Sequence, residues 1–275
     1  MRSAALARPQ DASAERLPAP AAWRRFPSRT LTFCIVELQK LSHDRTELVT
    51  RAVQPVLWLL IFGETFNRIH AIPTGGIPYL DFLAPGIIAQ SSMFVAIFYG
   101  IQIIWERDAG VLTKLLVTPT PRSALILGKS FAAGIRSISQ VVVVLVLSVI
   151  LGVTLTTSPL AVLGTFVIVM LGASFFSCLS MTIAGVVLKR DRLLGIGQMI
   201  TMPLFFASNA LYPISVMPQW LRVLALVNPL SYEVDALRGL LIGTPSHIAL
   251  DFGVLLFSVV IGVATASSLV DRLAR

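Results

Sequence analysis

The chain has 275 residues, of which 55% are apolar and only 13% are charged. Soluble domains usually contain about 25% charged residues, so this composition argues against a water-soluble globule, and it also excludes collagen-like, disordered and disulfide-rich classes. The formal net charge of +8 would suit a nucleic-acid binder, but basic residues that flank apolar segments usually set membrane topology. The composition therefore predicts an all-α, polytopic membrane protein.

The N-terminal part reads as two segments that do not cross a membrane. Residues 1–28 contain four prolines, no helical period and no continuous apolar stretch of the kind found in a secretory signal, so we interpret them as a disordered cytosolic tail. Over residues 29–47, apolar side chains recur on one helical face and charged side chains on another. This pattern is typical of a helix that lies in the membrane interface.

Six apolar segments follow, each close to the roughly 20 residues that a membrane-spanning helix needs. They are Thr50–Phe66, Phe82–Trp105, Ile135–Thr156, Leu160–Leu188, Leu193–Tyr212 and Ile248–Val270. Six crossings put both termini on one side, and that side then carries 19 of the 22 lysines and arginines. By the positive-inside rule this side is the cytosol, so we expect a multi-pass protein of the cell (inner) membrane, with no nucleic-acid partner.

Residues for catalysis, metal binding or nucleotide binding do not group in this sequence. The two cysteines and three histidines are scattered, which leaves no predicted disulfide or metal site. Gly128-Lys129-Ser130 ends like a phosphate-binding loop, but Ser123 stands where the first glycine of that loop is needed. We therefore predict no catalytic residue and no cofactor in this chain, and any ATP would be bound by another chain.

Two stretches between the predicted spans have too much pattern to be simple loops. They are Glu106–Lys129, on the cytosolic side, and Pro213–His247, on the external side. In the first, Leu112, Leu115 and Leu116 follow helical spacing before Pro119 ends the helix. Such an apolar ridge needs a cover, and composition alone leaves open whether lipid or a docked protein provides it.

These two stretches resemble the corresponding parts of one family, the six-helix permease subunits of type-2 ABC exporters, the drug, lipid and polysaccharide export group that includes daunorubicin-resistance-like permeases. The first match consists of Glu106, Arg107, Gly110, Leu112, Leu115, Leu116 and Pro119. The second runs from Leu211-Tyr212-Pro213-Ile214 through Met217-Pro218-Gln219-Trp220-Leu221 to the segment Asn228-Pro229-Leu230-Ser231-Tyr232-Glu233-Val234-Asp235-Ala236-Leu237-Arg238-Gly239. The resemblance covers residues 29–275, which we treat as one transmembrane domain.

The resemblance implies that a separate ATPase subunit supplies the energy for transport. The region 106–122 would form a coupling helix that docks on a separate ATPase subunit, present in two copies, which binds ATP and Mg. A second copy of this chain or a related permease would complete the pathway. Residues 213–247 would form external re-entrant helices carrying Asn228, Pro229, Tyr232, Asp235 and Arg238. An exposed ion pair between Asp235 and Arg238 would contribute only about 0–1 kcal/mol.

By the same resemblance, the second and fifth spans line the cavity for substrate. The candidate lining residues are Phe94, Phe98, Tyr99 and Gln102, together with Met199, Met202, Phe205, Phe206 and Asn209. Aromatic and methionine side chains suit varied apolar cargo because they offer large or adaptable contact surfaces. The alternative for each of them is helix packing or contact with lipid.

The resulting hypothesis is a permease subunit of an ATP-driven ABC exporter for an amphipathic or hydrophobic small molecule, such as a drug, lipid or glycolipid. The alternative is an ATP-independent secondary transporter or channel, which would show buried charge and inverted repeats. The sequence pattern places neither in the spans. A membrane-embedded enzyme, such as a lipid transferase, would need clustered catalytic groups that the sequence does not display.

Overall fold

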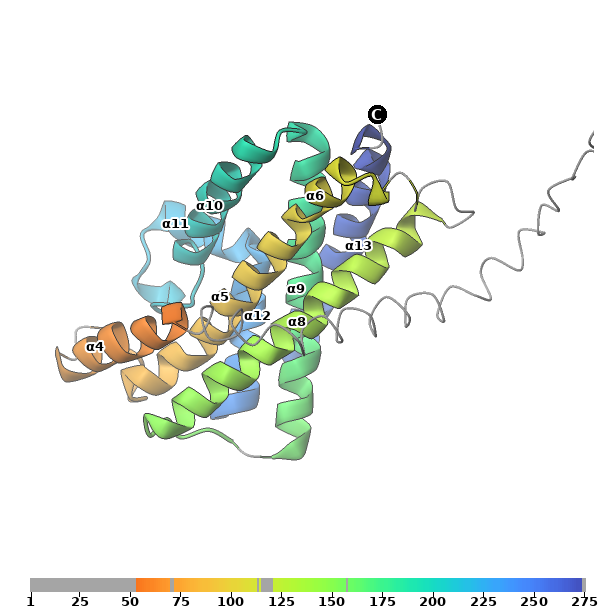
Figure 1. Ribbon diagram of the computed structural model, residues 1–275. Coiled ribbons are helices and arrows are strands. Elements are labelled where there is room, and N and C mark those ends of the chain that lie inside the picture. Colours follow the sequence, from red (N-terminus) through yellow and green to blue (C-terminus); the bar gives the residue numbers. More distant parts are fainter. Residues whose placement is uncertain (1–52, 70–71, 113, 115–120, 157, 274–275) are drawn as a thin grey trace, which may run out of the picture.

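The computed structural model describes residues 53–69, 72–112, 114, 121–156 and 158–273, and the secondary structure of these residues is helical throughout (Figure 1). The predicted tail and interfacial helix, residues 1–47, lie outside this range. The first described elements are a π-helix, η1 (Trp58–Gly63), and the short helix α4 (Glu64–Ile69). Together they lie along the start of α5.

Helix α5 (Tyr79–Ile101) occupies the centre of the bundle, and nearly all of its residues are buried. It has apolar side chains on every face, which is the pattern of a helix surrounded by others. Gly86 allows the close approach of another backbone, because a Cβ atom there would lie 2.4 Å from the carbonyl oxygen of Ala210. After a break at Gln102 the chain continues as α6 (Ile103–Asp108).

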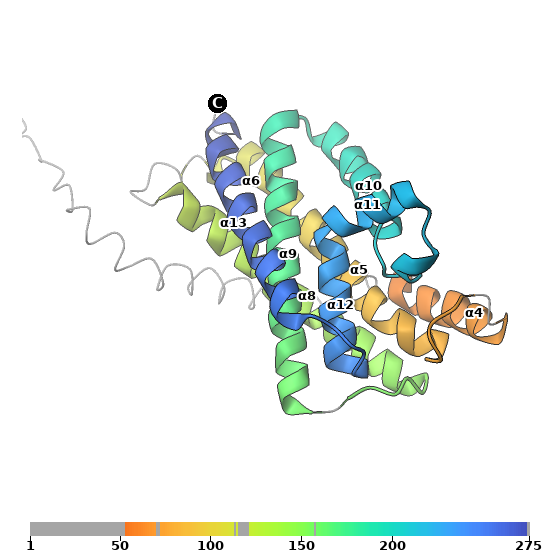
Figure 2. The ribbon, with the colours of Figure 1, turned by 180° about the vertical axis from the view of Figure 1, so that it is seen from behind.

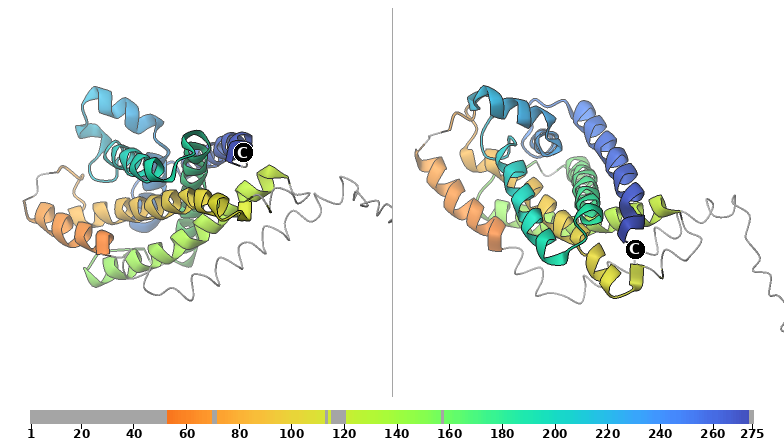
Figure 3. Two further views of the ribbon diagram at one scale, coloured as in Figure 1. Left: turned by 45° about the horizontal axis from the view of Figure 1, so that its top comes forward. Right: turned by 90° about the horizontal axis from the view of Figure 1, so that it is seen from above.

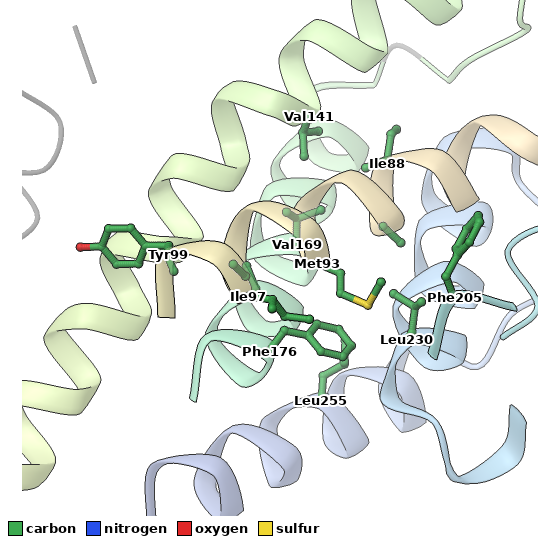
Figure 4. Packing of buried hydrophobic residues seen from close by; sticks show 14 of the residues in the cluster. Ile88, Met93, Ile97, Tyr99, Val141, Val169, Phe176, Phe205, Leu230 and Leu255 are labelled. Carbon is green, nitrogen blue, oxygen red and sulfur yellow. The ribbon is translucent and has the colours of Figure 1, made fainter. Parts of the chain in front are cut away.

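Two long helices, α8 (Arg122–Ile150) and α9 (Pro159–Val187), pack directly against α5, and a third, α13 (Ile248–Leu273), packs on the outer side of α9. Helix α9 packs against both α5 and α13, as Figure 2 shows from behind. Small residues lie at these contacts, since a Cβ on Gly262 of α13 would meet the side chain of Cys178 at 2.9 Å. Figure 4 shows Met93, Phe176 and Leu255 in the apolar core between these helices.

Four helices in the described part of the chain are long and apolar enough to cross a membrane. They are Tyr79–Asp108, Arg122–Ile150, Pro159–Val187 and Ile248–Val270. The helix predicted to start at Ile135 begins thirteen residues earlier, at Arg122, because its first turns are apolar enough to pack on the bundle. Its exposed valines, among them Val142, Val146 and Val149, form an apolar outer surface suited to lipid.

The other two predicted spans correspond to shorter helices. Helix α10 (Arg190–Phe206) has 17 residues and ends before Tyr212, the predicted limit of the fifth span. The described part of the first predicted span, from Val53 onward, is helical and contains the π-helical turn at Trp58–Gly63. Six crossings therefore stay a prediction, whereas the all-helical fold class with several apolar spans is confirmed.

The predicted external stretch folds into a 3-10 turn, η2 (Ile214–Val216), and two short helices, α11 (Gln219–Val227) and α12 (Pro229–Ile242). The Asn228 side chain accepts a hydrogen bond of 3.1 Å from the backbone N–H of Leu230, and Pro229 follows as the first helical residue. This is a favourable helix start. Helix α12 packs against α5, α9 and α13, whereas α11 lies mainly on the surface (Figure 3).

Candidate functional site

Helix α6 and the starts of α8 and α10 meet at one end of the bundle, the upper end in Figure 1, which we call the α6 end. There the Nζ of Lys129, on α8, lies 2.5 Å from the carboxylate of Glu106, on α6. The side chains of Lys129 and Glu106 are 11% and 29% exposed, so water screens this ion pair only in part. The pair ties α6 to α8.

Arg107 connects α6 to the turn between α9 and α10. Its guanidinium donates to the backbone carbonyl of Leu188 at 3.0 Å and to the Asp108 carboxylate at 2.9 Å. Leu188 ends α9 in the left-handed region, with φ of 54°, so its carbonyl is turned away from the regular helix pattern. Two residues later, Arg190 stacks on the ring of Trp105 at 5.0 Å.

Gly110 turns the chain out of α6 with φ of +69°, a conformation that L side chains rarely adopt. The next apolar residue of the predicted ridge, Leu112, is fully buried in the core of the bundle and so is not on the surface in this conformation. Leu115, Leu116 and Pro119, the rest of the predicted docking ridge, lie outside the described residues. The structure therefore places Glu106, Arg107 and Gly110 together at the α6 end.

A cavity of about 390 Å³ opens along one face of α5. Gln90, Phe94, Phe98 and Gln102 line it, and their four-residue spacing puts them on one stripe of the helix. The Phe94 and Phe98 rings stack with their centroids 6.3 Å apart. The other residues that line the cavity come from the segment before η1, from α5, from α6 and from α8: Gln54, Pro55, Ser91, Val95, Trp105 and Gln140.

Three of the nine predicted cavity residues, Phe94, Phe98 and Gln102, thus line this space. Tyr99 is buried beside α8, and its ring lies under the guanidinium of Arg136 at 4.9 Å (Figure 4). The predicted residues of α10 and the segment after it are elsewhere. Met199 and Phe206 are exposed, and Met202 is half-buried. The ring of Phe205 packs on Trp58. The Asn209 amide donates a hydrogen bond to the Asp235 carboxylate.

Sequence reasoning missed Gln90, Ser91 and Gln140 as cavity residues. The signal for Gln90 was present, because it lies one turn before Phe94 and two before Phe98 on the same helical face. Gln140 gave no such signal, because its approach to α5 depends on how α8 packs.

The expected ion pair between Asp235 and Arg238 is present, but only its acidic partner is exposed: the side chain of Asp235 is 46% exposed and that of Arg238 is 6% exposed. Arg238 lies 4.0 Å from Asp235. Its guanidinium donates to the backbone carbonyls of Asn209 at 2.6 Å, Ala210 at 3.3 Å and Phe82 at 3.3 Å, and it stacks on the Phe82 ring at 3.6 Å. These carbonyls, in the loop before η2 and at the start of α5, supply the hydrogen-bond acceptors that a buried guanidinium needs.

The remaining motif residues also secure helix ends. The Asn228 amide donates to the carbonyl of Leu204 at 2.7 Å and to that of Ala207 at 3.2 Å, at the end of α10. Tyr232 donates from its hydroxyl to the carbonyl of Leu226 in α11 at 2.7 Å. Together with Pro229, these residues hold α10, α11 and α12 in one arrangement.

Buried acidic groups are present that the sequence reading did not expect. Glu233 is completely buried; one carboxylate oxygen accepts from the Ser92 hydroxyl at 2.9 Å, and Oε2 has no hydrogen-bond partner among the described residues. Asp251, in the first turn of α13, is only 3% exposed. The described residues contain no group of three or more His, Cys, Asp or Glu side chains that could hold a metal ion.

Comparison with protein families decides the identity of this helical bundle. Residues 30–242 match the model of the ABC-2 type transporter family. The chain belongs to this family. As an ABC-2 family member with several long apolar helices, it is a multi-pass membrane protein, and relatives that it resembles are named as transport permeases.

Curated relatives agree with this assignment. The putative transport permease ycf38 of Porphyra purpurea is 31% identical over 196 residues, which cover 70% of this chain and 66% of the relative, just under two thirds of its length. The daunorubicin resistance ABC transporter permease protein DrrB1 of Streptomyces coeruleorubidus is 25% identical over 79% of this chain and 76% of its own. Nodulation protein J of Rhizobium leguminosarum bv. viciae is 25% identical over 79% and 84%.

Proposed function

We propose that this ABC-2 permease works as the membrane subunit of an ATP-driven exporter. Two ATPase subunits, each binding ATP and Mg, would act on the α6 end, and a second copy of this chain or a related permease would complete the pathway. Both termini would be cytosolic, with α11 and α12 as re-entrant helices near the outer face of the inner membrane. The observation that carries the proposal is the set of contacts that ties α6 to α8 and to the turn between α9 and α10.

These contacts give a displacement of α6 a route into the bundle. A push on α6 would act on α8 through Glu106 and Lys129, and on the start of α10 through Trp105 and Arg190. Helix α5 continues into α6 after one residue, so it would tilt with it. The ATPase would thereby shift the permease between inward-open and outward-open states.

The cargo proposed for this exporter is an amphipathic or hydrophobic small molecule. The α5 cavity supports this, because stacked phenylalanines provide an apolar wall beside amide side chains. The names of two relatives refer to daunorubicin and doxorubicin resistance. Outward movement of a drug-like molecule is consistent with such names.

A charge swap tests the coupling role. The permease is reconstituted with its ATPase in vesicles as wild type, E106K, K129E and the double variant E106K/K129E, and ATP-driven transport and ATPase co-purification are measured. We expect each single variant to lose at least ten-fold in transport and the double variant to recover most of it. As a matched control, the exposed pair Glu64 and Arg68 is swapped in the same way, with no loss expected. Full transport by both single variants would refute the coupling role.

Labelling tests the orientation. Single cysteines are placed at Lys114 and at His247, both exposed, in a chain in which Cys34 is replaced by alanine; Cys178 stays because it is buried. A membrane-impermeant thiol reagent applied to intact cells should label H247C and leave K114C unlabelled. The reverse pattern would overturn the proposed topology.

One observation favours a second candidate, a secondary transporter: the fully buried carboxyl group of Glu233. Intramembrane carboxyl groups are typical of proton-coupled transport. This candidate predicts transport driven by a proton gradient in vesicles without nucleotide. The exporter predicts no transport there and restored transport when ATP is added with the ATPase subunit.

A further inference from the structure

The chemistry of the α5 cavity points to the kind of cargo that it can hold, and the inference rests on the proposed role of this cavity in transport. Its described lining contains no charged side chain. The polar side chains of the lining are four carboxamides and one hydroxyl: Gln54, Gln90, Gln102, Gln140 and Ser91. The apolar side chains are largely aromatic and include Phe94, Phe98 and Trp105.

Gln90 is the lining residue that most requires a ligand. Its side chain is 1% exposed, and its Nε2 has no hydrogen-bond partner among the described residues. A buried amide donor without an acceptor is destabilising, and native proteins pair nearly all such groups. A hydroxyl or carbonyl oxygen of a molecule in the cavity would supply the missing acceptor.

The lining also selects against charge. A cation or an anion that entered would lose hydration without meeting an opposite charge on the described wall. For a cation the cost is greater, because Arg136 lies one turn before Gln140 on α8 and stacks on Tyr99, the neighbour of Phe98. A neutral molecule meets neither penalty.

We infer that the α5 cavity binds an uncharged, oxygen-bearing amphiphile, whose ring system or chain contacts Phe94 and Phe98 and whose hydroxyl or carbonyl groups bond to Gln90, Gln102 and Gln140. The cargo class is thus a neutral glycoside, polyol ether or polyketide-like molecule, and neither an ammonium-bearing drug nor an anionic lipid.

Three naphthyl probes that differ in the charge of their polar group test this in the full permease–ATPase complex in nanodiscs: 2-naphthyl β-D-glucopyranoside, which is neutral, 2-naphthylmethylammonium and naphthalene-2-sulfonate. Binding is measured by titration of the naphthyl fluorescence. We expect the glucoside to bind at least ten-fold more tightly than either charged probe. Equal or tighter binding of a charged probe would overturn the inference.

Replacement of Gln90 by methionine keeps the volume and removes the amide. Q90M should weaken glucoside binding about ten-fold and leave the two charged probes unchanged. Q219M, at an exposed glutamine on α11, is the matched control and should change nothing. Because Q90M alters a buried position, Q102M at a half-buried lining residue is measured beside it and should weaken the glucoside in the same direction. Unchanged glucoside binding in both variants would contradict the inference.

The outcome separates this inference from the proposed function. ATP-driven transport that depends on Glu106 and Lys129, with glucoside binding indifferent to Gln90 and Gln102, would overturn the cargo class and leave the exporter intact. Glucoside binding that depends on Gln90, in a complex that transports nothing with ATP, would support the site and overturn the exporter.

Discussion

The α6 end and the α12 region both hold their helices together with polar contacts, but the contacts differ in kind. At the α6 end, Glu106 and Lys129 are partly exposed and meet through single long side chains. Around α12, Arg238 is buried and donates to three backbone carbonyls on two segments. Contacts of the first kind can break and re-form at low cost, whereas those of the second kind cannot.

This difference suggests a division of labour between the two regions. A segment that transmits motion needs attachments that survive small displacements, and the long, partly exposed side chains of Glu106 and Lys129 offer that. A fixed frame needs satisfied, desolvated contacts, because losing any of them leaves a polar group unpaired. We therefore expect substitutions around α12 to destabilise the bundle, and substitutions at the α6 end to uncouple transport from ATP hydrolysis.

The largest effect is expected from R238M. It removes the donors to the carbonyls of Phe82, Asn209 and Ala210, and each buried carbonyl left unpaired costs about 1–3 kcal/mol, so the free energy of unfolding should fall by about 3–5 kcal/mol. Denaturant titration in mixed micelles measures it. The control is R222M, since exposed Arg222 donates to the carbonyl of Ser215 at 3.2 Å on the surface; its cost should stay within about 0.5 kcal/mol. Equal costs would show that burial of Arg238 is irrelevant.

G172A should have the next largest effect. A Cβ at Gly172 would lie 2.1 Å from Oε2 of Glu233, whose other oxygen is held by Ser92, so the carboxyl group has little freedom to move. Overpacking of this kind costs about 1–3 kcal/mol. The control is G253A on α13, where nothing lies within 4 Å of the added carbon and helix propensity favours alanine. If G172A and G253A have the same free energy of unfolding in the titration, the close contact between position 172 and Glu233 does not affect stability.

The sequence predicted the helical class of the fold but few of its buried polar contacts. The helical class followed from the composition, and the two short helices around Asn228 and Pro229 followed from the family resemblance. Burial of Glu233 and Arg238 did not follow, because charged residues on a short segment between spans read as exposed. Their burial depends on α12 packing among α5, α9 and α13, which is long-range information.

The candidate site divides in the same way. Phe94, Phe98 and Gln102 were assigned to the cavity by family likeness, and they line it because they share one face of a single helix. Gln140 and the contact between Arg107 and Leu188 were missed, because each joins segments far apart in the chain. Residues of α10 were assigned to the same cavity by family likeness, and in this single chain they lie elsewhere.

R107M should separate stability from coupling. The lost hydrogen bond to the carbonyl of Leu188 is partly exposed, so the free energy of unfolding should change by less than about 1 kcal/mol. Transport per ATP hydrolysed should nevertheless fall several-fold, because the turn before α10 would no longer follow α6. R192M, at an exposed arginine of the same region, serves as control and should keep the wild-type ratio. Normal transport per ATP hydrolysed in R107M would show that the turn between α9 and α10 does not take part in coupling.

The smallest effect is expected from R68Q. Arg68 and Glu64 are one turn apart on α4, their side chains are 84% and 46% exposed, and the closest atoms are 3.7 Å apart. Water and salt screen such a pair, so its loss should cost at most about 0.5 kcal/mol and shrink further at high ionic strength. Unfolding titrations at low and high salt measure both. A cost near that of R238M would mean that an exposed and a buried arginine contribute alike here, and the contrast between the α6 end and the α12 region would lose its physical basis.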